Sequence, residues 1–222
     1  MIKLFISSFY NTLIDEEDAI PTSTMFSIDH LKQKKVQFAI TTNRLQNEVL
    51  YYNQDYPFID YIISLNGSLI YDVNHEKTIE LKSFTQKELE MISQEFVEKE
   101  IWYYTKDDIW NIIPQEAVYK LEIKGLKEWK NTKYHTSLLK RNQESFLEIG
   151  KNTPYDAIKK LKVKEENIVG VIGNDSEESI LHAIPKTYVV RNASKKLKEQ
   201  TSNLVKSNKL KGVESVIKKE LC

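Results

Sequence analysis

Polar residues that could do chemistry follow a short apolar run at the start of the chain. Residues 2–6 form a short run that is apolar except for Lys3, which is typical of a strand buried on both faces of a parallel sheet, and Ser7 and Ser8 end this run. Open α/β sheets bind ligands at the carboxyl ends of their strands, so we expect chemistry in the loop after Ser8. A serine hydroxyl there acts as a nucleophile only when a base or a metal activates it.

No base stands near Ser8 in the sequence. The four histidines are scattered along the chain, at positions 30, 75, 135 and 182. We therefore interpret Ser8 as a small residue that closes a strand. Asp15 is not expected to replace a missing catalytic carboxylate, because it lies beyond Thr12 and Leu13, where the chain should already be leaving the pocket. Residues 15–18 are acidic and are expected to be exposed.

The elements that must position this loop alternate between apolar runs and amphipathic stretches. Such alternation predicts a parallel sheet wound by right-handed crossovers, with the segments 68–72 and 78–81 added as a hairpin. Helices are predicted from residue 21, residue 45 and residue 153, after the turn at 173–178, and at 194–199 and 213–221. Further strands are predicted at 36–41, 59–64, 168–172 and 188–190.

The middle of the chain has a different character. Thr85 and Glu88 have the spacing of a capping box at the start of a helix. Strand-like runs follow at 101–105, 109–113, 118–123, 134–139 and 145–149, with a short helix predicted at 126–130. We predict an α/β protein with a core domain at 1–82 and 152–222 and a small α/β cap with an antiparallel sheet at 83–151. Trp102, Trp110 and Trp129 all lie in this cap, either as its core or as an aromatic face over a ligand.

Several short motifs resemble those of the Cof-type branch (subfamily IIB) of the haloacid dehalogenase superfamily of phosphohydrolases. This resemblance implies a Rossmann-like core with a cap inserted after the third strand. It also implies that Thr42, Arg44 and Asn66 bind phosphate or substrate. The matching segments are Ser-Phe-Tyr-Asn-Thr-Leu at 8–13, Ile-Thr-Thr-Asn-Arg at 40–44, Leu-Asn-Gly-Ser-Leu-Ile-Tyr at 65–71, Arg-Asn-Ala at 191–193 and Ser-Asn-Lys-Leu-Lys-Gly-Val at 207–213.

The catalytic residues that the resemblance implies are missing. The aspartate that attacks phosphorus is replaced by Ser8, and the aspartate that acts as general acid is replaced by Tyr10. The lysine that neutralises the phosphoryl oxygens is replaced by Pro154, and nearby Lys151 is expected to be solvated. The three positions are therefore vestigial on this interpretation.

The metal-binding motif, Gly-Asp-x-x-Asn-Asp in the family, also departs from its pattern. Without a gap it aligns with residues 173–178 and places Asn174 at the first ligand position, whereas a one-residue gap would place Asp175 there. Asp175 and Glu178 also have the spacing of a capping box. Magnesium prefers carboxylate oxygens in octahedral geometry, so we expect Mg²⁺ to bind weakly or not at all.

Composition bounds the function further. Lysine plus arginine and aspartate plus glutamate both number 32, so the net charge of zero argues against a general nucleic-acid binder. No signal peptide or membrane span is predicted, and the one cysteine, Cys222, fits a reducing cytoplasm.

We expect a non-catalytic relative that binds a phosphorylated small molecule or a protein partner. The alternative is a magnesium-dependent phosphomonoester (sugar phosphate) hydrolase with atypical or residual activity. The sequence does not specify an oligomeric state.

Overall fold

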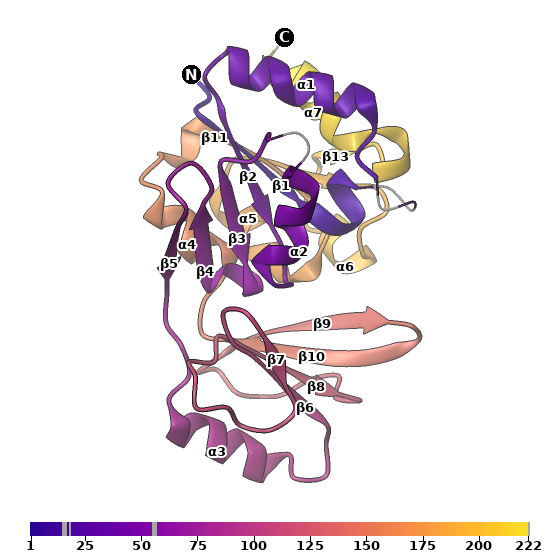
Figure 1. Ribbon diagram of the computed structural model, residues 1–222. Coiled ribbons are helices and arrows are strands. Elements are labelled where there is room, and N and C mark those ends of the chain that lie inside the picture. The colour runs from indigo at the N-terminus through magenta and orange to yellow at the C-terminus, as the bar shows by residue number, and fades with distance from the viewer. Residues whose placement is uncertain (15–16, 18, 55–56, 222) are drawn as a thin grey trace.

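The structure, a computed structural model, folds into two parts that are each built around one β-sheet (Figure 1). It describes residues 1–14, 17, 19–54 and 57–221. Asp15, Glu16 and Asp18 of the stretch predicted to be acidic and exposed lie outside the described residues, as does Cys222. No helix within the described ranges is long and apolar enough to cross a membrane.

The larger sheet has its strands in the order β13-β12-β11-β1-β2-β3-β4-β5. β1 lies in the middle and pairs in parallel with β11 and β2, as the alternating pattern predicts. β4 and β5 add the predicted antiparallel hairpin at one edge. The strands are β1 (Leu4–Ser8), β2 (Gln37–Thr41), β3 (Tyr61–Ser64), β4 (Leu69–Asp72), β5 (Lys77–Glu80), β11 (Ile168–Ile172), β12 (Lys186–Val190) and β13 (Leu204–Val205).

Amphipathic helices cover this sheet and complete its hydrophobic core. Ile28 and Leu31 of α1 are fully buried, and α1 packs against α7. Thr153 and Asp156 form a capping box at the start of α4, with Pro154 in the first turn. The helices are α1 (Thr22–Gln33), α2 (Gln46–Leu50), α4 (Pro154–Lys160), α5 (Glu178–Ala183), α6 (Lys195–Lys198) and α7 (Gly212–Leu221).

The smaller sheet is antiparallel, with the strand order β7-β6-β8-β10-β9. Helix α3 covers one of its faces and begins with the predicted capping box of Thr85 and Glu88. Trp129 packs into the cap core against the ring of Tyr134, whereas Trp110 is 39% exposed on β7. The elements are α3 (Gln86–Glu95), β6 (Ile101–Tyr104), β7 (Ile109–Trp110), β8 (Lys120–Lys124), β9 (His135–Arg141) and β10 (Glu144–Gly150).

The other face of the cap sheet meets the core, and Figure 1 shows β9 and β10 running below the core sheet. Tyr104 and Tyr119 of the cap pack against leucines of the core. The chain passes between core and cap twice, at Lys82 and at Asn152, and we call these segments the two crossings. The side-chain amide of Asn152 joins them: it donates a hydrogen bond to the carbonyl of Lys82 at 2.7 Å and accepts one from the N–H of Lys82 at 3.3 Å. The predicted domain boundaries at 82/83 and 151/152 fall at these crossings and stay a prediction.

One local prediction is wrong and one strand was missed. β1 extends two residues beyond the predicted apolar run and closes at Ser8, because parallel pairing with β2 continues as far as Ser8. Residues 126–130 are irregular instead of helical, since tertiary packing of Trp129 against Phe96 and Tyr134 outweighs local helix propensity. The short strand β13 was not predicted, because its two residues are too few to give a periodic signal.

Candidate functional site

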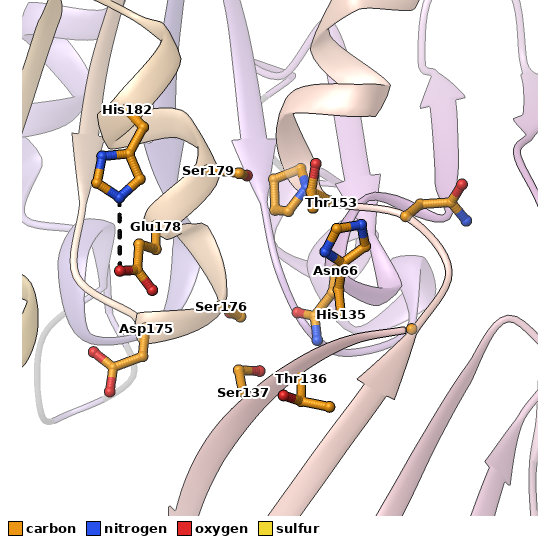
Figure 2. Close-up of a pocket in the computed structure, with 13 residues that line it drawn as sticks. Asn66, His135, Thr136, Ser137, Thr153, Asp175, Ser176, Glu178, Ser179 and His182 are labelled. Carbon is orange, nitrogen blue, oxygen red and sulfur yellow. Dashed lines mark ion pairs between the residues drawn. The ribbon is translucent and has the colours of Figure 1, made fainter. Parts of the chain in front are cut away.

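Two cavities lie between the core and the cap strands β9 and β10. Their volumes are about 410 and 380 Å³, and Asp175 and Ser176 line both, so we call them together the cap–core cleft. Figure 2 shows Asp175 and Glu178 across from Thr136 and Ser137 of β9. Most lining residues carry a hydroxyl, carboxylate or amide side chain, and the amides belong to Asn11, Asn43, Asn66, Asn152, Asn174 and Asn192.

Ser8 is fully buried and lines neither cavity. Its hydroxyl donates a hydrogen bond to the carboxylate of Glu177 and accepts one from the N–H of Gly173 at 3.1 Å. The hydroxyl of Thr41 donates to the other oxygen of Glu177 at 2.5 Å, and the N–H of Asn174 donates to the first at 3.2 Å. The carboxyl ends of β1, β2 and β11 therefore converge on one buried carboxylate.

The turn after β11 brings Glu177 to this position. Asn174 caps the turn, and Asn174 and Glu177 exchange side-chain hydrogen bonds with each other's backbone N–H as a capping box. The predicted box between Asp175 and Glu178 is therefore wrong by one residue. Gly173 permits the close approach of the β1 loop, because a Cβ at Gly173 would lie 2.4 Å from the hydroxyl oxygen of Thr12.

Glu177 is buried among hydrogen-bond donors, and no cation is paired with it in the described part of the chain. Burial raises the pKa of Glu177 above its ordinary value, while the hydrogen bonds from Ser8 and Thr41 oppose this change. Within the described residues, no basic side chain forms an ion pair with this carboxylate. Hydroxyl and N–H donors therefore surround this carboxyl group, without a paired cation among the described residues.

Tyr10 and Arg44 are held to each other and to Glu48. The guanidinium carbon of Arg44 lies 3.9 Å from the centroid of the Tyr10 ring, and Arg44 forms an ion pair with Glu48 at 3.0 Å. The Tyr10 hydroxyl donates to the same carboxylate oxygen at 3.3 Å. Burial, partly opposed by Arg44, raises the pKa of Tyr10 to about 12. The phenol therefore keeps its proton at neutral pH.

Of the other residues predicted at the site, Asn66 and Pro154 line the cleft, whereas Thr42 and Arg44 do not. Thr42 is buried, and its hydroxyl accepts a hydrogen bond from the N–H of Arg44 at 3.1 Å. The N–H of Asn66 donates to the carbonyl of Thr42 at 3.3 Å, which ties the loops after β2 and β3 together.

Lys151 lies away from the cleft. Its ammonium group forms an ion pair with Glu88 at 2.8 Å, and its side chain is 20% exposed. Glu88 also pairs with Lys133 at 2.7 Å. The prediction that Lys151 is solvated is therefore wrong, and the lysine is held at the start of α3 instead of facing the loop after Ser8.

On the cap side, a buried ion network faces the core. The ammonium group of Lys120 pairs with Glu122 at 2.7 Å and with Glu148 at 3.2 Å, and it lies 3.9 Å from the centroid of the Tyr104 ring. It also donates to the carbonyl of Asn43 at 2.7 Å. Burial opposes the charge of Lys120, but the two glutamates outweigh burial and raise the pKa of Lys120. This network ties the cap to the loop after β2.

A model of the haloacid dehalogenase-like hydrolases matches residues 9–172, which is well over half of the chain. The chain belongs to the haloacid dehalogenase-like hydrolase family. The family predicted from the motifs is thereby confirmed, and so is the fold of an α/β core with an antiparallel cap. A search of curated proteins found no match.

Solved structures of this family share the fold over their full length. A haloacid dehalogenase-like hydrolase from B. subtilis has 13% identity and a TM-score of 0.85, covering 99% of this chain and 100% of the other. One from Bacteroides thetaiotaomicron has 11% identity and a TM-score of 0.76, covering 99% of each chain. The subclass IIB sugar phosphatase BT4131 has 16% identity and a TM-score of 0.77, covering 98% of each chain.

The residues of this family member do not fit the Mg²⁺ ion that the resemblance implies. Asn174 offers a neutral amide, and its side chain caps the turn after β11. Asp175 accepts a hydrogen bond from Ser194 at 2.5 Å, and Glu178 pairs with Lys196 at 2.8 Å. Across the described part of the chain, no three acidic, histidine or cysteine side chains are grouped as a metal site would require.

Glu177 is the site residue that the sequence reasoning missed. In the ungapped alignment it occupies the position of the asparagine in the family's Gly-Asp-x-x-Asn-Asp motif. The available signal was its spacing from Asn174, which is that of an N-cap and its N3 acid. The family member thus lacks a carboxylate at Ser8 and has gained one at Glu177, on the adjacent strand loop.

Proposed function

We propose that this haloacid dehalogenase-like protein does not hydrolyse phosphate esters and that it binds a small molecule of the sugar-phosphate class in the cap–core cleft. The observation that carries the proposal is the buried hydrogen bond between Ser8 and Glu177. In the family's route, a carboxylate at position 8 attacks phosphorus. Here the side chain at position 8 is a hydroxyl group, and it donates a hydrogen bond to the buried carboxylate of Glu177.

Ser8 is too deeply buried for a substrate to reach it, which argues against Ser8 as a nucleophile activated by Glu177. A carboxylate beside a serine can act as its base in principle. A reacting phosphorus would have to approach the hydroxyl oxygen to about 3.5 Å or less. Ser8 is 0% exposed and lines neither cavity of the cleft, so no substrate atom reaches that distance without opening the core.

Separate observations argue against Tyr10 as a general acid and against a bound metal ion at the turn after β11. The raised pKa of Tyr10, about 12, makes it a weak proton donor to a leaving group at neutral pH. Asn174, Asp175 and Glu178 are engaged as a cap, a hydrogen-bond acceptor and an ion-pair partner. Since catalytic groups act as a unit, these losses do not add, and together they affect the nucleophile, the general acid and the metal ligands.

The cleft lining supports the class of ligand. Its serine, threonine, asparagine and aspartate side chains are the donors and acceptors that recognise sugar hydroxyls. The shared fold with a sugar phosphatase points the same way. Asn66 would contact such a ligand directly, and Thr42 and Arg44 would position the loop at Asn43, which lines the cleft.

The first experiment measures phosphate release from an aryl phosphate with magnesium and with a chelator. We expect wild type, Ser8→Ala and Glu177→Gln to release phosphate at the same background rate, far below the roughly 1 per second that is ordinary for enzymes. Wild-type turnover of about 1 per second that Ser8→Ala abolishes would establish the alternative, an enzyme with serine as its nucleophile.

The second experiment measures melting temperature against a panel of sugars and sugar phosphates, because a ligand that binds only the native state must raise it. The variant Ser176→Tyr places a ring in the wall shared by both cavities, and Ser202→Tyr is its control at an exposed site. We expect Ser176→Tyr alone to abolish the shift. No shift with any compound would contradict the ligand and leave a protein partner as the expected role.

A further inference from the structure

A third cavity lies at the hinge, where the chain crosses between core and cap. Its volume is about 760 Å³, larger than either cavity of the cleft. Its walls come from four segments: the end of β5, the second crossing, α4 and the start of β9. We call it the hinge pocket. Its charged lining consists of Lys82, Lys151, Lys159, Lys160, Glu80 and Asp156, and His135 also lines it.

Two of these four lysines have acidic partners. Lys151 pairs with Glu88 at 2.8 Å and Lys159 pairs with Asp156 at 2.9 Å. Within the described ranges, Lys82 and Lys160 have no acidic group within 4.0 Å of their ammonium nitrogens. These two charges are therefore free to bind another anion.

The two carboxylates in the pocket are already engaged. Asp156 accepts hydrogen bonds from Thr153 at the start of α4 as well as pairing with Lys159. Glu80 accepts a hydrogen bond from the hydroxyl of Tyr119. The pocket therefore presents more positive charge than its acidic groups neutralise.

The cap–core cleft has the opposite balance. Its described lining contains three carboxylates, from Asp175, Glu178 and Glu148, and one lysine, Lys140. A compact anion without sugar hydroxyls is therefore held less favourably in the cleft than in the hinge pocket, whereas a sugar phosphate can gain hydrogen bonds to its hydroxyls in the cleft. The difference is largest for anions that carry several charges, since the interaction scales with the product of charges.

We propose that the hinge pocket binds a compact polyphosphate anion, such as pyrophosphate or the diphosphate group of a metabolite. Lysine ammonium groups bind phosphate as mobile point charges, and four lysines, two of them without an acidic partner, line a cavity large enough for such a group. This proposal does not depend on the function proposed for the cleft.

The position of the pocket gives the bound anion a mechanical effect. Lys82 and Lys151 lie on the two crossings that Asn152 joins, whereas Lys159 and Lys160 lie at the end of α4. An anion held by both pairs fixes the crossings against α4 and so restricts the angle between cap and core.

The test is calorimetric titration of the full chain with inorganic pyrophosphate, orthophosphate and citrate. We expect pyrophosphate to bind with a Kd of about 1 mM or lower at low salt. Orthophosphate should bind several-fold more weakly, and raising the salt from about 50 to about 200 mM should weaken pyrophosphate binding because Lys82 and Lys160 are exposed. Citrate binding as tightly as pyrophosphate would overturn the assignment to phosphate.

The decisive variant is Lys82→Gln/Lys160→Gln, with Lys140→Gln/Lys195→Gln as a control of equal charge change. Both members of the first pair are exposed and without ion pairs among the described residues, so the melting temperature should not change. We expect the hinge variant to weaken pyrophosphate binding about tenfold or more and the control to change it less than twofold. Equal weakening by both variants, or weakening by the control alone, would refute the hinge pocket.

A second readout uses the wild-type chain. Acylation of lysine amines followed by mass spectrometry should show that pyrophosphate protects Lys82 and Lys160 and leaves Lys140 unprotected. Protection of Lys140 instead would place the anion in the cleft and overturn the proposal.

Discussion

The hydroxyl of Ser8, at the end of β1, donates a hydrogen bond to the carboxylate of Glu177, in the turn after β11. The contact joins the carboxyl ends of two adjacent parallel strands. Thr41 adds a third strand to it by donating to the same carboxylate at 2.5 Å. The position from which the family's nucleophile would act is thus part of an interior hydrogen-bond network that holds three strand ends together.

Replacing Glu177 with glutamine should destabilise the protein by about 1–3 kcal/mol, because one acceptor oxygen becomes an NH₂ group that faces a hydroxyl or N–H donor. Chemical denaturation followed by far-UV circular dichroism measures this cost. The matched control is Glu178→Gln, one residue further along and about a third exposed, which should cost much less. Equal costs for the two variants would mean that the Ser8–Glu177 network contributes little.

The stability contributed by position 177 should depend on pH in a defined direction. Burial raises the folded-state pKa of Glu177 above its ordinary value of 4.5. Its contribution is therefore fully present below about pH 4.5 and is lost as the pH rises through the raised pKa. The unfolding free energy of wild type minus that of Glu177→Gln should fall with pH above this point. A difference that is flat or rises with pH would contradict the direction of the shift.

Ser8→Asp should destabilise the protein when made alone, and Glu177→Asn should restore part of the lost stability. Ser8→Asp places a second carboxylate against Glu177 in a buried site, so it should cost several kcal/mol of stability, about 3 or more. Glu177→Asn removes the repulsion and restores the family's residue at that position. A double-mutant cycle on unfolding free energy should give a favourable coupling of about 1–3 kcal/mol between the two changes. Additive effects would show that the side chains do not interact.

Removing the buried ammonium group of the cap should be costly. Lys120→Met leaves Glu122 and Glu148 without their main cation, so we expect a loss of about 3–5 kcal/mol. Lys124→Met, on the same strand but with a side chain that is 37% exposed, is the control and should change the unfolding free energy little. Hydrogen exchange at the loop around Asn43 should rise in Lys120→Met only, because Lys120 binds the carbonyl of Asn43.

Local signals predicted the architecture, and the site depends on contacts that are not local. The capping box of Thr85 and Glu88 and the apolar runs that became β1 and β11 are readable from a few residues each. The meeting of Ser8 with Glu177 joins residues 169 positions apart, which no short pattern records. Lys120 shows the same limit, since alternation in Lys-Leu-Glu-Ile-Lys assigns it to a solvated face that the core in fact covers.

The central pairing of the core sheet has a consequence for synthesis on the ribosome. Leu4 of β1 pairs with Ile168 of β11, so one side of β1 stays open until the whole cap has been translated. The cap is contiguous in sequence and has its own hydrophobic cluster, so it can fold before β11 has been synthesised. A nascent chain that ends near residue 151 would then carry a folded cap beside an apolar strand with a free edge. Chaperone contacts during translation should therefore concentrate on the first fifth of the chain and end when β11 emerges.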